Sequence, residues 1–374
     1  DEQKYWIGGP APNKFVTPSA ACVKALVVTG VGDMLMLGGI LIMYYYAGTL
    51  NVRELYETSV TWIPQIAASP GMIILLSLLL IAGPMGKSAQ FPFHEWLPEA
   101  MAGPGPVSAL IHAATMVKSG VYLVARLLPI FYYGYWVAGA EEAMAFFNVV
   151  AWIGAFTAFL AATQGMVAIE LKKVLAYSTV SQIGYMMLGL GVAGMSSSLL
   201  VDGFTAGVFH LVSHAMFKAC LFLCAGTVIH AVHSIYITDM GGLKKQLPRT
   251  WIFMIIAAAS LVGFPWFTPG FWSKEAVLHA ALEVSWPLFT VGLITAGLTA
   301  FYTVRFMGIV FWGKPSENVR HAEHAGGHVD DGSPSMWIAS GILAVALLLM
   351  GFFGPFVLEP ALHHGFEHSL VGVL

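Results

Sequence analysis

Three titratable side chains stand four residues apart within one apolar stretch, residues 199–230. His210, His214 and Lys218 occupy positions i, i+4 and i+8 of that stretch. On a helix they would cover an arc of about 80° and an axial length of about 12 Å. Imidazole and amine groups at this spacing can pass protons through intervening water. The pattern predicts a proton relay on one helix face, and an inert histidine pair is the alternative.

Zinc is a second alternative for His210 and His214, because two histidines four residues apart can hold it. No glutamate lies between them, as the metalloprotease pattern requires. Cys220 and Cys224 would lie about 9–15 Å further along the same helix, too far to complete a tetrahedral site. No Cys-x-x-Cys pair is present either. We therefore predict no metal and no cofactor on this chain.

Lys87 and Lys274 stand beside proline and glycine residues that interrupt apolar segments at 83–92 and 263–275. Such residues break the helical hydrogen-bond ladder, and paired broken helices mark the ion pathway of transporters built from repeats. We predict that both lysines load and release protons. A snorkelling Lys87 is one alternative. Lys274 and Glu275 can instead form a structural ion pair rather than a coupled titrating pair.

Acidic residues accompany these lysines. Glu95 and Glu99 follow Lys87 closely and favour a functional role for it. Asp33 is a lone carboxylate among apolar residues, and it could pair with a lysine elsewhere and tune it.

Four further basic groups lie within or beside apolar runs. His112 lies far enough inside its run to need a partner, and a structural or a functional role is equally expected. Lys118 lies about 120° from it on a helical wheel, so we leave Lys118 out of the path. Lys172 and Lys173 begin another apolar run and can be interface anchors or functional groups.

The elements that hold these groups must be membrane helices. Of 374 residues, 57% are hydrophobic and only 10% are charged, against about 25% charged in a soluble domain. Each ionisable group inside a membrane helix costs at least about 2.5–3.5 kcal/mol, so retaining several indicates function. The net charge of −3 gives no reason to expect nucleic acid as a partner.

A helix needs about 20 mainly apolar residues to span a bilayer. The sequence contains about nine such segments. Only helices or closed barrels satisfy the backbone in lipid, and the short alternating strands of a barrel are absent. The segments cover residues 20–47, 71–91, 104–131, 144–169, 174–195, 199–230, 250–268, 285–313 and 335–358.

Two connections carry further signals. Residues 231–249 contain Lys244, Lys245 and Arg249, which predicts that this connection faces the cytoplasm or matrix. Residues 314–334 contain three histidines, and we favour a solvated linker there over a metal site. These histidines are His321, His324 and His328.

Several of these motifs together resemble the antiporter-like subunits of respiratory complex I. The resemblance is strongest to the distal L subunit and to the related large subunit of multi-subunit Na⁺/H⁺ antiporters, and it covers roughly residues 20–315. The motifs are GKSAQ (86–90), WLPEAMAGP (96–104), PVSALIHAATMV (106–117), KKVLAYST (172–179), SQIGYM (181–186), residues 210–218, MGGL (240–243) and FWSKE (271–275).

The resemblance implies two inverted repeats with broken helices, about 14 helices in all. It implies that residues 1–131 are the remainder of the first repeat and 132–313 the second, with a histidine-rich loop and one more span at 314–374. The implied proton path uses Lys87, His112, Lys172, His210, His214, Lys218 and Lys274. Asp33 and Glu275 match acidic positions that act as electrostatic partners.

The sequence departs from the family in two respects. Gly30 stands where the family often has an arginine. The family's key glutamate would lie upstream of Asp1, and a lateral amphipathic helix and a final span would follow Leu374. We therefore expect this sequence to be part of a longer chain. By itself it cannot complete the first half-channel.

The resemblance implies a proton-translocating membrane-arm subunit without redox chemistry of its own. Flavin, iron–sulfur clusters and quinone would bind to partner subunits, and the electron donor would be NADH, reduced coenzyme F420 or ferredoxin. The expected neighbours are an adjacent antiporter-like subunit and the lipid bilayer, in a prokaryotic plasma membrane or the mitochondrial inner membrane. The alternatives are a Na⁺/H⁺ antiporter subunit, a hydrogenase-type subunit or a purely structural membrane subunit.

Overall fold

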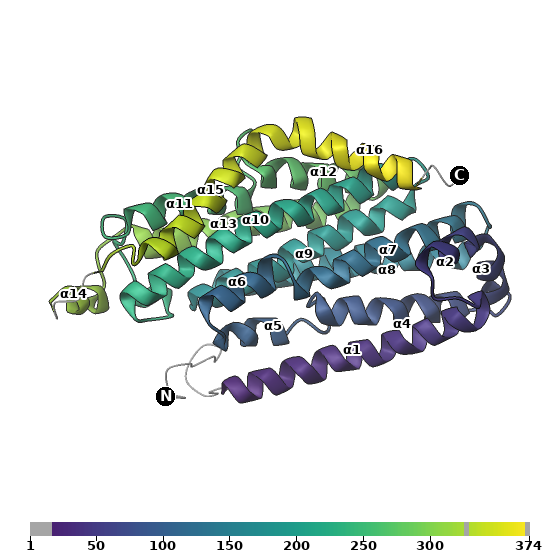
Figure 1. Ribbon diagram of the computed structural model, residues 1–374, viewed down its shortest axis with the longest axis horizontal. Helices are drawn as coiled ribbons and strands as arrows, with labels where there is room; N and C mark the ends of the chain where they lie inside the picture. The colour runs from purple at the N-terminus through teal and green to yellow at the C-terminus, as the bar shows by residue number, and fades with distance from the viewer. Residues whose placement is uncertain (1–16, 325–328, 371–374) are drawn as a thin grey trace.

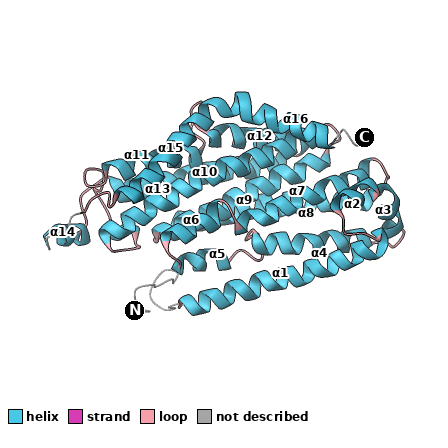
Figure 2. Ribbon diagram, viewed as in Figure 1, coloured by secondary structure: helices cyan, strands magenta, loops and turns pink. Residues whose placement is uncertain are grey.

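The computed structural model describes residues 17–324 and 329–370, which form a bundle of helices lying side by side along the long axis (Figure 1). In the described residues helices are joined by loops, and no strand is drawn (Figure 2). The predicted all-α, polytopic architecture with broken helices is confirmed. The long helices are α1 (Pro18–Ala47), α4 (Met72–Lys87), α7 (Met116–Trp136), α8 (Met144–Val167), α9 (Leu171–Met195), α10 (Leu200–Val232), α11 (Pro248–Val262), α12 (Pro269–Val284), α13 (Trp286–Phe311) and α15 (Pro334–Phe353).

Six helical segments of the described chain are long and apolar enough to cross a membrane, or seven if the bent pair α3 (Ser59–Ala67) and α4 is one span. Every predicted span overlaps a helix or a pair of helices. α9 is not among the six, because polar residues such as Ser178 and Gln182 lower its hydropathy. It is nevertheless almost wholly buried by its neighbours.

The first break follows Lys87, the last residue of α4. Residues 88–95 leave the helical path, and the chain then forms α5 (Trp96–Glu99), a 3₁₀ turn at Ala100–Ala102 and α6 (Gly105–Ala113). The predicted single span 104–131 is wrong in detail, because the helix stops at Ala113 and restarts at Met116 as α7.

The second break lies between α11 and α12. Gly263 has φ +86°, a left-handed conformation that ends α11, so the prediction that this helix continues to residue 268 is wrong. Pro269 then begins α12, which runs to Val284 and which the sequence prediction treated as a connection. The two breaks therefore lie in separate halves of the chain, as expected, while the repeat boundary near residue 131 remains a prediction.

Close helix packing places α9 in the interior. Gly154 of α8 and Gly184 of α9 face each other, and a Cβ added to Gly184 would lie 2.5 Å from the Gly154 oxygen. Small residues at such contacts let helix backbones approach closely, which is how membrane helices gain van der Waals energy. The polar side chains of α9 are thereby held against α10.

The C-terminal part packs on α10. α15 continues through a π-helical turn (Gly354–Leu358) into α16 (Glu359–Leu370), which was not predicted as a separate helix. The histidine-rich connection contains α14 (Glu317–His324), and His328 lies outside the described residues. A short helix α2 (Val52–Glu57) precedes α3 at the end of the bundle where α16 lies (Figure 1).

Candidate proton path

The predicted relay lies in the centre of the bundle, on α10. His210, His214 and Lys218 each have 0% of their surface exposed. α10 is continuous over this region, so the predicted spacing on one helix is confirmed. Three different helices receive the three side chains: α12 faces His210, α7 faces His214 and α9 faces Lys218.

At the end formed by Lys218, the relay contacts α9. Lys218 Nζ donates a hydrogen bond to the backbone oxygen of Leu175 at 3.1 Å and a short one to Ser178 Oγ. Both acceptors are neutral. No carboxylate lies within ion-pair distance of Lys218 in the described part of the chain, so no ion pair fixes its charge.

Lys118 contacts the relay directly, although the sequence analysis left it out. Its Nζ lies 2.7 Å from His214 Nδ1, and the lysine is 6% exposed. The angle of about 120° between His112 and Lys118 on a helical wheel assumed that both residues belong to one continuous helix. Because the helix breaks between Ala113 and Met116, α7 has a new phase and turns Lys118 toward α10.

Lys274 lies beyond the other end of the relay. His210 Nδ1 is 2.9 Å from Ser273 Oγ, the residue before Lys274 on α12. Lys274 Nζ donates a short hydrogen bond to the Leu261 oxygen near the end of α11, and it lies 5.8 Å from the ring centre of Tyr185. The carbonyl end of a helix carries partial negative charge, so it favours an ammonium group there.

Lys87 is the last residue of α4 and stands directly before the first break, whereas Lys274 stands after the second break. Asp33 Oδ2 lies 2.7 Å from Lys87 Nζ, which confirms the predicted pairing of Asp33 with a lysine. The two side chains are 33% and 39% exposed, so Lys87 is less buried than expected. Glu95 and Glu99 do not contact Lys87; they lie 3.7 and 2.7 Å from Lys24.

His112 and Lys172 lie nearer the opposite end of the path. His112 is fully buried and stacks on Phe222 with 4.6 Å between ring centres, and neither of its nitrogens has a hydrogen-bond partner within the described residues. Lys172 donates to the Gly103 oxygen at 2.8 Å. Direct contacts therefore do not join these two residues to the relay.

Lys173 instead pairs with Glu170, at 2.9 Å. Glu170 lies between the spans, where burial raises the pKa of its carboxyl and Lys173 partly counters that rise.

Glu275 does not pair with its neighbour Lys274. It is exposed on α12 and lines a cavity of about 340 Å³ that Lys274 also lines. Adjacent residues on a helix point about 100° apart, which separates the amine from the carboxylate. A structural Lys274–Glu275 ion pair is therefore not formed.

Neutral polar residues of α9 and α12 were missed because only titratable groups were considered. Ser178 and Ser273 bond to Lys218 and His210, and Gln182 is buried with no partner for its amide in the described structure. Ser178 and Gln182 stand four residues apart in an apolar stretch. That spacing could have indicated a polar helix face.

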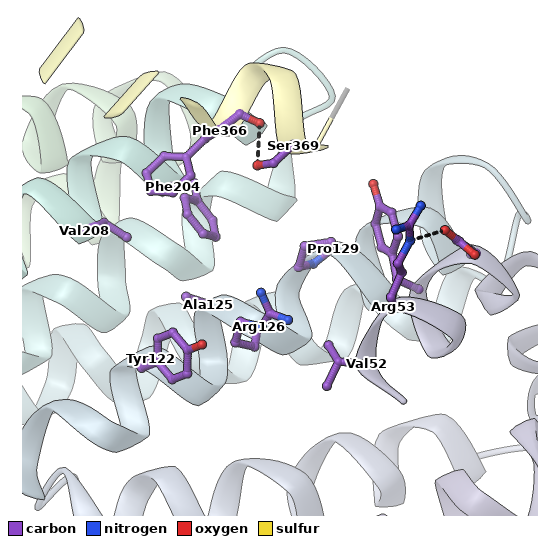
Figure 3. Close-up of a pocket in the computed structure, with 12 residues that line it drawn as sticks. Val52, Arg53, Tyr122, Ala125, Arg126, Pro129, Phe204, Val208, Phe366 and Ser369 are labelled. Atoms are coloured by element: carbon purple, nitrogen blue, oxygen red, sulfur yellow. Dashed lines mark hydrogen bonds and ion pairs between the residues drawn. The ribbon is translucent and has the colours of Figure 1, made fainter. Parts of the chain in front are cut away.

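A larger cavity, about 500 Å³, lies apart from this path between α7, α10 and α16 (Figure 3). Arg126, Phe204 and Phe366 line it, and none of the predicted path residues does. Among the described residues no group of three or more histidine, cysteine or acidic side chains has the geometry of a metal site.

Comparisons with known proteins show which family this chain resembles. The family described as NADH:quinone oxidoreductase/Mrp antiporter, transmembrane, matches residues 13–299. NAD(P)H-quinone oxidoreductase chain 5 of Synechocystis is 38% identical, over 89% of this chain and 52% of the relative. NADH-quinone oxidoreductase subunit L of Escherichia coli is 41% identical, over 91% of this chain and 51% of the relative.

A solved structure is similar as well. The Mrp complex from Dietzia matches with a TM-score of 0.74 and 30% identity, over 96% of this chain and 36% of the matched one. The chain spans about half the length of the curated relatives it matches. The family match, which covers most of the chain, shows that it belongs to the NADH:quinone oxidoreductase/Mrp antiporter transmembrane family.

Proposed function

We propose that this chain is a proton-translocating subunit in the membrane arm of a complex I-like redox pump. The observation that carries the proposal is a pair of buried contacts, Lys118 with His214 and His210 with Ser273. The two imidazole rings lie 6.4 Å apart between their centres, and Lys274 follows Ser273 on α12. Histidine and lysine can each take up and release a proton, and the serine hydroxyl can accept and donate a hydrogen bond. These groups therefore provide successive proton carriers through the buried centre of the bundle.

The remaining groups extend this path. We propose Lys87 as the group that responds to charge in a neighbouring subunit, with Asp33 as its electrostatic partner. Lys218, His112 and Lys172 lead from the relay toward the end of the bundle where α10 ends. Within the described residues, both nitrogens of His112 and the Nε2 atoms of His210 and His214 are buried without a hydrogen-bond partner. In protein interiors water often satisfies such atoms, and it can link proton carriers that do not touch.

Redox chemistry belongs to partner subunits in this proposal. They would hold the flavin, iron–sulfur clusters and quinone, and an adjacent antiporter-like subunit would contact this one. The relatives are named as subunits of quinone oxidoreductases, which supports this assignment. We place the parent complex in a prokaryotic plasma membrane, or in the mitochondrial inner membrane if the source is eukaryotic.

The test uses the complete complex in sealed inverted membrane vesicles with Lys218→Ala. We expect normal assembly and quinone reduction with fewer protons moved per quinone reduced. The difference from the unmodified complex is the share of pumping that this subunit carries. Lys245→Ala, an exposed lysine off the path, is the matched control. Unchanged proton stoichiometry in assembled Lys218→Ala complex would refute the proposal.

A Na⁺/H⁺ antiporter subunit is the second candidate, favoured by the likeness to the Mrp complex. Vesicles distinguish the two candidates. An antiporter exchanges Na⁺ for H⁺ when an ion gradient is imposed and no electron donor is present, whereas the redox pump needs the donor. Sodium uptake that is driven by an imposed proton gradient and abolished by a protonophore would favour the antiporter, whereas sodium uptake that continues with a donor and a protonophore together would indicate redox-driven sodium pumping.

A further inference from the structure

A second titratable cluster lies outside the relay, at the end of the bundle where α10 begins. It surrounds a cavity of about 340 Å³ between α10, α12 and α16. We call this cluster the acid–histidine port. Its titratable residues are Asp202 from α10, Glu275, His279 and Glu283 from α12, and Glu359 and His363 from α16, and no lysine or arginine lines the cavity.

The port adjoins the end of the proposed path. Glu275 and His279 line the port and also the neighbouring cavity that contains Lys274. Glu275, His279 and Glu283 stand four residues apart, so they follow one face of α12 from Lys274 outward. A proton that leaves the Lys274 ammonium can therefore meet the Glu275 carboxylate first and the outer groups afterwards.

A buried hydroxyl points to a polar occupant of the port. Thr205 of α10 lines the cavity with only 3% of its surface exposed, and its Oγ1 has no hydrogen-bond partner in the described structure. Buried polar atoms are almost always satisfied, by protein or by water. Water in this cavity would satisfy Thr205 and connect the carboxylates to it.

Outer groups of the port are paired and accessible to solvent. His363 Nε2 lies 3.0 Å from Asp202 Oδ1, and His279 Nδ1 lies 3.4 Å from Glu283 Oε1. All four of these side chains are more than 40% exposed. An imidazole can accept a proton at one ring nitrogen and donate one from the other. Such pairs can take a proton from the interior and pass it to the bulk solvent.

We propose that the acid–histidine port is the proton-release site of this subunit, where Lys274 delivers protons to the side opposite the connection that contains Lys244 and Lys245. The port collects a proton on a carboxylate or imidazole and releases it to water or buffer. This inference rests on the proposed function and names the exit of the same path. The ligand that it assigns to the cavity is water carrying an excess proton.

The test removes three acids that lie outside the relay. The complex carries Asp202→Asn, Glu283→Gln and Glu359→Gln together, in inverted vesicles whose lumen holds either weak buffer or concentrated membrane-impermeant sulfonate buffer near pH 7. A dye that reports membrane potential follows pumping, because buffer does not suppress that signal. His364→Gln with Glu367→Gln is the matched control, since these residues are also on α16 but do not line the port.

In weak lumenal buffer we expect the triple variant to lose most of the share of pumping that Lys218→Ala removes. Concentrated lumenal buffer should restore that share, because the buffer replaces the missing proton acceptors. The control should pump normally in both. Assembly and quinone reduction are measured in every sample.

Three results would overturn the proposal that the port releases protons. Normal pumping of the triple variant in weak buffer would do so, as would a loss that lumenal buffer does not restore, which indicates a structural role. Rescue by buffer outside the vesicles alone would place release at the other end. If Lys218→Ala also pumps normally, the proposed function fails, whereas a normal triple variant beside a defective Lys218→Ala refutes only the port.

Discussion

At the scale of residues, the central lysines have neutral partners. Lys118 contacts an imidazole, Lys218 a hydroxyl and a carbonyl, and Lys274 a carbonyl. An ion pair holds both of its members charged, because removal of one proton leaves a buried charge without compensation. Neutral acceptors impose no such requirement, so these amines can change protonation state while their contacts persist. Lys87, with Asp33 beside it, is the exception.

Lys118 should be as important as the residues predicted from sequence. We expect Lys118→Ala to remove the same share of proton pumping as Lys218→Ala, because it removes the group that contacts His214. Protons moved per quinone reduced in vesicles give the measurement. Lys245→Ala again serves as the control, and full pumping in assembled Lys118→Ala complex would exclude this lysine from the path.

Asp33 should act through Lys87 and not through stability. The pair is partly exposed, so Asp33→Asn should change the stability of the complex by less than about 1 kcal/mol. Pumping should nevertheless fall, because the charge beside Lys87 is lost. A double-mutant cycle provides the check: in a Lys87→Ala background, Asp33→Asn should cause no further loss of pumping. Additive losses would show that the two residues act independently.

At the scale of elements, the sequence predicted helices well and their breaks less well. Residues 199–230 were expected as a span and α10 covers Leu200–Val232, which put His210, His214 and Lys218 in the expected register. The interruption at Ala114 and Thr115 contains no proline or glycine, so the local sequence did not predict it. It changed the direction of Lys118. The local sequence around Thr205 is that of an ordinary helix. Its role in lining the cavity depends on the packing of α12 and α16 against α10, which the sequence does not show.

The contact between α8 and α9 should be intolerant of one extra methyl group. A Cβ at Gly184 would meet the Gly154 oxygen at 2.5 Å and Ala158 at 2.8 Å. We expect Gly184→Ala to destabilise the bundle by about 1–3 kcal/mol, the usual cost of overpacking. Thermal denaturation of the complex in detergent measures the effect. Gly297→Ala is the control, because nothing lies within 4 Å of its added Cβ, and equal stability of both variants would contradict the packing.

At the scale of the whole molecule, the two ends of the bundle differ in charge. The connection after α10 carries Lys244, Lys245 and Arg249, while the port at the opposite end has carboxylates and histidines and no lysine or arginine. The proposed proton-release port therefore lies at the end of the bundle opposite these basic residues. The orientation predicted from these loop charges, with the basic connection facing the cytoplasm or matrix, remains a prediction.

Cysteine labelling tests that orientation. In a Cys22→Ser background, Cys220 and Cys224 are buried and should not react with a membrane-impermeant maleimide. We expect Lys245→Cys to react in inverted vesicles and His364→Cys to react in right-side-out vesicles. Both residues are exposed, and α16, which contains His364, lies at the end of the bundle opposite the start of α11, which follows Lys245 (Figure 1). Labelling of both from the same side would contradict the predicted orientation.

The continuity of α10 has a consequence for timing. Its three path residues touch three different helices, α12, α7 and α9, yet they belong to one rigid rod. A small rotation of α10 about its axis would therefore change all three donor–acceptor distances together. Proton steps that look local along the path would then be synchronised, so a signal that turns this single helix would open or interrupt every step at the same moment.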